Sequence, residues 1–210
     1  MSGLFISFEG NDGAGKTTQS KLLKEYLEGC GYSVRLFREP GGTEISEKIR
    51  EIILDNENYK MKHMTEALLY AAARCQLVYE GILPALKGGQ IVICDRFLDS
   101  SLVYQGVGRG LGIDVVKDIN SYATGGLMPD LTFFLHLDFS EALQRKNYQH
   151  ELDRMENQKA YFHNRVYKGF MELAESEKDR IVTIEADKKP EIIAEEIIDY
   201  FNYFVGSRGL

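Results

Sequence analysis

The sequence predicts an α/β fold, a doubly wound five-stranded parallel sheet with helices on both faces and a small lid. Three observations predict it: short apolar runs typical of buried strands, longer runs of helical periodicity between them, and glycines or prolines at the junctions. Parallel neighbours need a long crossover connection, which is usually a helix, so this alternation favours a parallel sheet. The order of the strands is left open.

Each expected strand is a short apolar run, as in sheets that are covered on both faces. Glu9-Gly10 ends the first run, and Pro129-Asp130 introduces the fourth. The five expected strands are Leu4–Phe8, Ser33–Phe37, Gln90–Cys94, Leu131–Leu137 and Ile181–Ile184.

The expected helices carry apolar residues at helical spacing, with charged residues between them. The first opens near Lys16, and Gly29 and Gly31 bracket its end, as glycines do at helix C-termini. Gly88-Gly89 stops the longest, which is rich in alanine and leucine. The other expected helices are Ile45–Leu54, Thr65–Leu86, Asp114–Tyr122 and Glu191–Phe204.

Length and composition are typical of one globular domain, which would span residues 1–210. Of the 210 residues, 44% are hydrophobic, which suffices for a full core. The net charge of -7 argues against polymeric nucleic acid as a partner. No apolar stretch approaches the ~18 residues of a membrane span, and the N-terminus does not resemble a secretion signal. We therefore expect no membrane partner and a cytoplasmic location.

The cysteines do not form a recognisable metal or disulfide pattern. Cys30, Cys75 and Cys94 are odd in number, irregular in spacing and without a CxxC pair. We expect reduced thiols in or near the core.

A glycine-rich loop between the first strand and the first helix predicts a nucleotide site. Gly10-Asn11-Asp12-Gly13-Ala14-Gly15-Lys16-Thr17 fits GxxxxGK[ST] at every fixed position. The glycines let successive N–H groups point at phosphate oxygens, and the helix start adds its dipole. Lys16 is expected on the β- and γ-phosphates, Thr17 on Mg²⁺ and Thr18 on the α-phosphate. Motors, switches and small-molecule kinases share this loop, so it does not identify the acceptor.

Two arginines at the ends of neighbouring expected strands point to an anionic acceptor. Arg38 follows the second strand and Arg96 follows the third, and ligands of doubly wound sheets bind beyond these strand ends. Together they would clamp one anionic group, while Asp95 would orient Mg²⁺ or its waters. Two alternatives stay open: Arg38 in a surface ion pair with Glu39 or a neighbour, and Asp95 as a helix cap paired with Arg96.

Further polar residues suggest a pocket for a planar base. Tyr70 and Arg74 are four residues apart on the long helix and share a face, which offers a stacking surface and directed donors. The alternative is an aromatic residue in the core with an arginine on the rim. A polar cluster after Arg96 is more typical of a ligand wall than of a core segment: Ser100, Ser101, Tyr104 and Gln105.

One polar segment interrupts the regular alternation. Gln144–Arg154 is strongly charged and polar, and two interpretations remain open: a solvated helix face, or a mobile lid that closes over phosphates. The lid would span approximately residues 143–156.

Taken together, these motifs resemble those of thymidylate kinases, and the resemblance covers nearly the whole chain. The matching segments, in chain order, are Phe8–Gln19, Arg38–Thr43, Tyr70–Arg74, Asp95–Phe97 with Ser100-Ser101 and Tyr104-Gln105, and Glu151–Arg154.

The resemblance implies a single nucleoside monophosphate kinase-like domain of the P-loop NTPase type that phosphorylates dTMP to dTDP with ATP and Mg²⁺. It also implies a homodimer packed through helices; the apolar Thr65–Leu86 helix would suit such a contact or the core. The implied dTMP contacts are Arg38 and Arg96 on the 5′-phosphate, Tyr70 and Arg74 on thymine, Ser101 at the base edge, Tyr104 on the sugar and Asp12 on its 3′-hydroxyl.

The family has two forms, which differ in where the catalytic arginine sits. One form carries it in the phosphate loop just after the position of Asp12, where this chain has Gly13. The chain therefore resembles the form whose lid supplies the arginine. The favoured residue is Arg145, with Arg154 second and Lys146 as a helper.

Two rival functions remain open from the sequence. The first is another nucleotide kinase, acting on dUMP, CMP or a deoxynucleoside; Arg38 and Arg96 favour a phosphorylated acceptor over a free nucleoside. The second is a P-loop ATPase switch, which needs the phosphate loop but not Tyr70, Arg74 or the polar wall.

Overall fold

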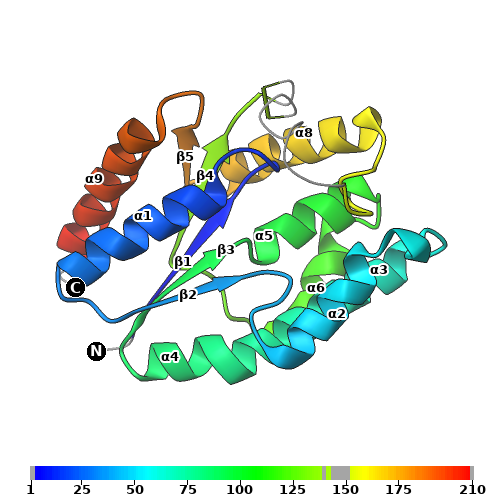
Figure 1. Cartoon of the computed structure of the whole chain (residues 1–210), viewed down its shortest axis with the longest axis horizontal. Helices are drawn as coiled ribbons and strands as arrows, with labels where there is room; N and C mark the ends of the chain where they lie inside the picture. Colours follow the sequence, from blue (N-terminus) through cyan, green and yellow to red (C-terminus); the bar gives the residue numbers. More distant parts are fainter. Residues whose placement is uncertain (1–2, 139–140, 143–151, 209–210) are drawn as a thin grey trace.

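The computed structural model describes residues 3–138, 141–142 and 152–208. Five parallel strands form one sheet in the order β2-β3-β1-β4-β5 (Figure 1). The strands are β1 (Leu4–Glu9), β2 (Val34–Arg38), β3 (Ile91–Asp95), β4 (Leu131–His136) and β5 (Ile181–Glu185). The predicted α/β class and the all-parallel sheet are confirmed.

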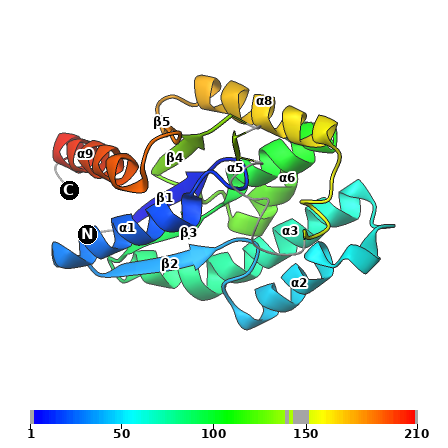
Figure 2. The same cartoon turned by 45° about the horizontal axis from the view of Figure 1, so that its top comes forward.

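Alternate side chains of each strand supply two separate cores, one on either face of the sheet. Phe5 and Val92 pack with α3 (His63–Leu77) and α8 (Ala160–Ser176) on one face. Ile6 and Ile93 pack with α1 (Lys16–Gly29) and α9 (Pro190–Arg208) on the other. This period of two, with both faces covered, explains why the strands are continuous apolar runs (Figure 2).

The longest expected helix is not a single regular α-helix. It consists of α3, a π-helical segment η2 (Val78–Ile82) and α4 (Leu83–Lys87). Pro84 lies in the first turn of α4 and cannot donate a backbone hydrogen bond, so the preceding turn is where the regular pattern changes.

Two helical segments longer than one turn were missed. Leu98–Ser101 (α5) continues as the π-helical segment η3 (Leu102–Gly108), in the stretch expected to be only a polar wall. In α8 the buried residues Phe162, Val166 and Phe170 recur every four residues, a periodicity visible in the sequence. The remaining helices are α2 (Glu44–Leu54), the short η1 (Asn56–Asn58) and α6 (Ile113–Thr124).

The cysteines follow the expectation only in part. Cys94 is buried and Cys75 half-buried, but Cys30 is exposed at the end of α1. None of the described helices combines the length and hydropathy that crossing a membrane would require.

Register brings the carboxyl ends of three strands together. Asp95 on β3 pairs with Phe8 on β1 and with Arg38 on β2. The segments that leave these three strands therefore start at one edge of the sheet, which is where ligands of such folds bind.

Candidate active site

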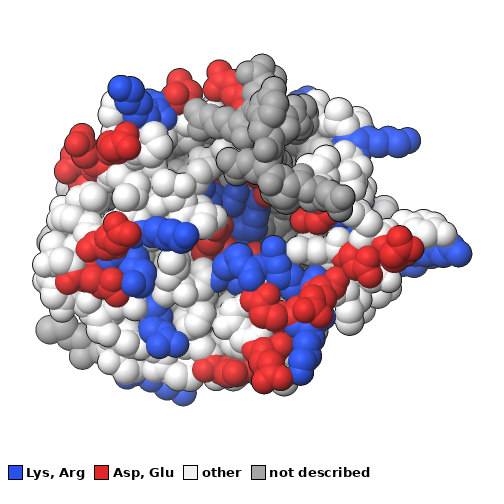
Figure 3. All heavy atoms as spheres, in the orientation of Figure 1, with Lys and Arg blue, Asp and Glu red and all other residues white. Residues whose placement is uncertain are grey.

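A cavity of about 480 Å³ opens at this edge of the sheet. Figure 3 shows Lys and Arg side chains gathered in a hollow at the centre of this face. The cavity is lined by the phosphate-loop end of α1, by the segment after β2, by α3 and by α5 with η3. It brings together the seven residues with an implied dTMP contact and the two further residues of the expected ligand wall: Asp12, Arg38, Tyr70, Arg74, Arg96, Ser101 and Tyr104, with Ser100 and Gln105.

The phosphate loop is held in a shape that needs its glycines. Gly13 has φ 86°, and a Cβ there would lie 2.5 Å from the carbonyl oxygen of Ala142. Lys16 opens α1, is only 6% exposed and donates from Nζ to the carbonyl of Asn11 at 2.8 Å. Burial, and then the charge of Arg96, lower the pKa of Lys16 to about 8. A polyphosphate bound in this loop would supply the missing counter-charge.

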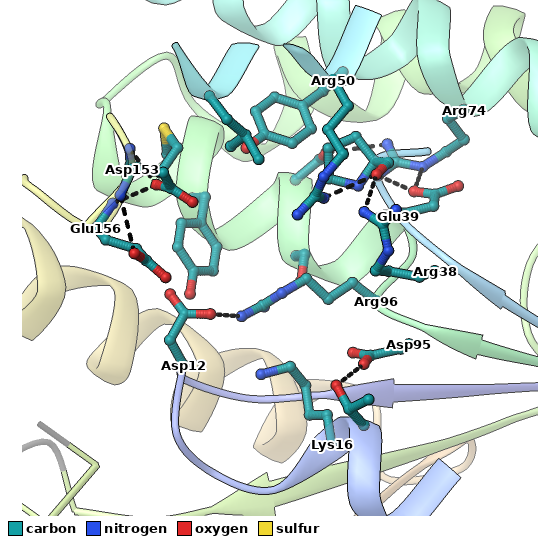
Figure 4. Close-up of a pocket in the computed structure, with 18 of the residues that line it drawn as sticks. Asp12, Lys16, Arg38, Glu39, Arg50, Arg74, Asp95, Arg96, Asp153 and Glu156 are labelled. Carbon is teal, nitrogen blue, oxygen red and sulfur yellow. Dashed lines mark hydrogen bonds and ion pairs between the residues drawn. The ribbon is translucent and has the colours of Figure 1, made fainter. Parts of the chain in front are cut away.

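Thr17 and Asp95 meet at the start of α1. The Thr17 hydroxyl donates to Asp95 Oδ2 at 2.5 Å, which joins the phosphate loop to the end of β3 (Figure 4). The alternative, in which Asp95 caps the following helix, does not describe α5, because Phe97 occupies its cap position. A hydroxyl beside a carboxylate gives two hard oxygen ligands, the kind that Mg²⁺ prefers.

Arg96 connects the donor loop to the acceptor side of the cavity. Its backbone has φ 70°, the only positive value outside glycine among the described residues. Nη1 donates to the carbonyl of Gly10 and to Ser100 Oγ, both at 3.0 Å, and Nη2 donates to Asp12 Oδ1 at 2.5 Å. Its guanidinium carbon also lies 5.2 Å from the ring centroid of Tyr104.

Arg38 and Arg50 face Arg96 across the cavity (Figure 4). Arg38 forms an ion pair with Glu47 at 2.8 Å. The alternative in which Arg38 pairs with a nearby carboxylate therefore holds in this structure, and the partner is Glu47 rather than Glu39. Arg38 and Arg50 both donate to the carbonyl of Pro40 at 2.9 Å. Sequence reasoning missed Arg50 because it was one polar position in a helix whose neighbours were unknown.

Arg74 is buried rather than on the rim. It is 1% exposed and lies 2.7 Å from Glu39, with further bonds at 3.0 Å to Ser101 Oγ and the carbonyl of Phe97, and a short one to Asn120. Burial raises the pKa of Glu39, while Arg74 opposes that shift. The guanidinium thus fixes the wall of the base pocket, and Tyr70 lies one helical turn away on the same cavity.

Arg154, the second choice for a catalytic lid arginine, does not itself line the cavity, although its neighbours Asp153 and Met155 do. It is 6% exposed, donates to Glu66 Oε2 at 2.7 Å and to the carbonyl of Ile53 at 2.6 Å. Glu66 also accepts from Arg109 and Gln105. Arg154 therefore links the segment that precedes α8 to α2 and α3. The first choice, Arg145, and its helper Lys146 lie outside the described residues.

Replacing Arg154 should reduce stability more than catalysis. In the Arg154→Ala variant the buried Glu66 carboxylate keeps Arg109 but loses one of its two cations, so we expect a loss of about 2 kcal/mol in the free energy of unfolding. Urea unfolding measures this, with the exposed Lys159→Ala as control. A kcat loss above about 100-fold with unchanged stability would instead indicate a direct catalytic role.

Comparison with known proteins identifies the family to which this arrangement belongs. The family model described as Thymidylate kinase matches residues 8–197. The chain belongs to the thymidylate kinase family.

Relatives support the same assignment along nearly the whole chain. The thymidylate kinase of Bacillus velezensis is 48% identical over 204 residues, which cover 96% of each protein. That of Finegoldia magna is 50% identical over 196 residues, covering 93% of this chain and 96% of the relative. The crystal structure of thymidylate kinase from Ehrlichia chaffeensis superposes with a TM-score of 0.79 at 32% identity, covering 96% of this chain and all of that one.

Proposed function

We propose that the cavity binds dTMP beside ATP·Mg²⁺ and supports direct transfer of the γ-phosphoryl group to the dTMP phosphate. The reaction is that of the thymidylate kinase family: ATP plus dTMP gives ADP plus dTDP. One observation carries the proposal for the site. Arg96, from the acceptor side, is bonded to Gly10 and Asp12 of the donor loop, so acceptor and donor groups share one cavity.

On the acceptor side, Arg96 and Arg38 would hold the 5′-phosphate and Tyr70 would stack on thymine. Arg74 would act at the base mainly through Ser101, whose hydroxyl it holds, and Gln105 completes that wall. Tyr104 would lie against the sugar and Asp12 near its 3′-hydroxyl. Arg50 adds positive charge to the phosphate end.

On the donor side, the residues from Gly10 to Thr18 would bind the ATP phosphates. Thr17 and Asp95 fit Mg²⁺, since they offer adjacent oxygen ligands while the phosphates supply others. Bound there, the ion would neutralise charge on the β- and γ-phosphates.

The acceptor needs no general base. A phosphomonoester has its second pKa near ~6, so it is largely dianionic at neutral pH. Lys16 and Arg96 would then act by alignment and charge neutralisation, with Arg145, helped by Lys146, as the proposed lid contribution. We also infer a cytoplasmic enzyme with small-molecule substrates and no nucleic-acid polymer as partner.

A panel of acceptors tests the function. ADP formation from ATP·Mg²⁺ is followed with dTMP, dUMP, dCMP, dGMP, dAMP or thymidine added separately. We expect dTMP to give the highest kcat/KM and thymidine to give none, because Arg38 and Arg96 require an anion. ATP hydrolysis that no acceptor accelerates would point to an ATPase switch. A preference for another monophosphate would mean that the residues assigned to the base pocket are wrong.

An exposed apolar face supports a homodimer. Large apolar side chains project from α2, α3 and α6, which contact one another as a layer. Leu68 on α3 is 51% exposed although it lies at the centre of a helix. On each of these helices two exposed large apolar residues are four or seven positions apart and so share a side: Ile45 and Ile52 on α2, Met64 and Leu68 on α3, and Val115 and Tyr122 on α6.

A charge on this face should prevent dimer formation. In Leu68→Glu the carboxylate would have to be buried against an apolar partner surface, which is unfavourable by several kcal/mol. We expect wild type to elute as a dimer in size-exclusion chromatography with light scattering, and the variant as a monomer. Tyr203→Glu, on the exposed side of α9, is the matched control. An equally dimeric Leu68→Glu variant would exclude this face.

A further inference from the structure

A buried carboxylate lies directly behind the arginine that joins the two halves of the site. Glu9 is the last residue of β1 and is 1% exposed. It is not among the residues that line the cavity, so neither substrate would touch it.

Both oxygens of Glu9 accept hydrogen bonds from the segment that follows Arg96. The backbone N–H of Phe97 donates to Oε1 at 2.7 Å, and the Ser100 hydroxyl donates to Oε2 at 2.5 Å. The carboxylate thereby ties β1 to the first turn of α5.

The Ser100 contact passes on to Arg96. A hydroxyl has one hydrogen, and Ser100 gives it to Glu9, so its oxygen faces Arg96 as an acceptor. Arg96 Nη1 donates to that oxygen at 3.0 Å. Glu9 therefore restrains Arg96 twice: through its side chain by way of Ser100, and through its backbone by way of the adjacent Phe97.

That restraint acts on a residue in a costly conformation. A non-glycine residue in the left-handed region is disfavoured and persists only where neighbours hold it. Arg96 adopts this conformation at φ 70°, and its own N–H is held by the carbonyl of Phe8, one residue before Glu9.

We propose that Glu9 is a positioning residue for phosphoryl transfer: as a carboxylate it fixes Ser100 and Phe97 and so aims the guanidinium of Arg96 at the acceptor phosphate. The proposal rests on the proposed function of Arg96. It assigns to Glu9 no contact with substrate and no proton transfer.

The charges around Glu9 make its ionisation measurable. Asp99 on α5 faces it and is itself paired with Arg180 at 2.7 Å, while Arg96, Lys16 and the Cys94 thiol lie on the other elements around it. Burial first, and then Asp99, raise the pKa of Glu9 to about 7. Below that pH one carboxyl oxygen carries a proton and becomes a donor, so it accepts less strongly from its partner.

The test compares wild type with Glu9→Gln and Ser100→Ala. We expect kcat/KM for dTMP to fall roughly tenfold or more in each at pH 8, and the double variant to lose little beyond either single one, because both break the same connection. Glu28→Gln, an exposed carboxylate at the far end of α1, is the control.

A pH series distinguishes positioning from general structural support. The ratio of wild-type to Glu9→Gln kcat/KM should rise between pH 6 and 8 with a midpoint near 7, because the substrate's own titration cancels in the ratio. The melting temperature of Glu9→Gln at pH 8 should not fall, since ionising a carboxyl of raised pKa disfavours the folded state.

Three results would overturn the proposal: wild-type activity in Glu9→Gln, a ratio independent of pH, or activity lost only in proportion to a lower melting temperature. If Glu9→Gln does not fold, Ser100→Ala decides. Full activity in that variant would show that the connection from Glu9 through Ser100 to Arg96 is not needed. Arg96→Ala in the same assay keeps the two proposals apart. Normal activity there refutes the clamp itself, whereas an inactive Arg96→Ala with an active Glu9→Gln refutes only the role of Glu9.

Discussion

Lys16→Ala is expected to lower kcat by about 10³-fold or more, with a folded and equally stable protein. Lys16 is the one lysine lining the cavity within the described residues, and it opens α1 at the phosphate loop. Its charge would neutralise the β- and γ-phosphates as the phosphoryl group moves, an effect that is large in a water-poor site. Steady-state kinetics with saturating ATP and dTMP measure the loss.

Stability should not fall with activity in this variant. The lowered pKa of Lys16 means that burial disfavours its charged form, so removing the ammonium relieves a cost in the free protein. Lys24→Ala, on the exposed side of the same helix, removes a lysine and its ion pair with Glu28 and serves as the control. Turnover by Lys16→Ala within tenfold of wild type would contradict the assignment of the phosphate loop as the ATP site.

Arg96→Ala is expected to reduce kcat/KM for dTMP by roughly 10²- to 10³-fold. Arg96 supplies a fixed pair of charged donors between the loop and the acceptor, and charge-assisted bonds of this kind are among the strongest in a binding site. Arg96→Lys should recover only a small part of the loss, because an ammonium cannot reproduce the planar fork. Arg35→Ala, an exposed arginine on β2, is the control, and a wild-type KM for dTMP in Arg96→Ala would exclude the clamp.

The left-handed backbone of Arg96 gives the same position a second test. Alanine there keeps the steric cost of φ 70°, whereas glycine does not. Arg96→Gly should therefore be more stable to urea than Arg96→Ala by about 1 kcal/mol, although we expect both to lose most of their activity. Equal stability would mean that the backbone relaxes once the guanidinium is removed.

The predicted strands and most helices depended on local patterns, and the structure agrees with them to within a few residues. Continuous apolar runs identify strands covered on both faces, and this holds without knowing the neighbours. The π-helical segments around Val78 and Tyr104 could not be predicted in this way, because they arise from changes in hydrogen-bond register. α8 was missed although its apolar spacing was present.

The residues of the site likewise differ in whether the sequence could predict their place. The phosphate loop and the segment after Asp95 are contiguous in sequence, so their place at one edge followed from the fold class. Arg50, Glu39 and Glu9 take their roles from partners outside their own helix or strand: Arg50 contacts the carbonyl of Pro40, Glu39 contacts Arg74 and Glu9 contacts Ser100. Their residue types alone are equally compatible with surface ion pairs.

Both arginines proposed to receive the dTMP phosphate already hold a carboxylate, Arg96 that of Asp12 at 2.5 Å and Arg38 that of Glu47 at 2.8 Å. In the proposed site, dTMP binding would therefore be an exchange of anions, in which the phosphate replaces the carboxylates of Asp12 and Glu47 rather than meeting unpaired arginines. Exchange of this kind favours a dianion over weaker anions and limits the net affinity. As dTDP leaves such a site, Asp12 and Glu47 would re-form their ion pairs with Arg96 and Arg38.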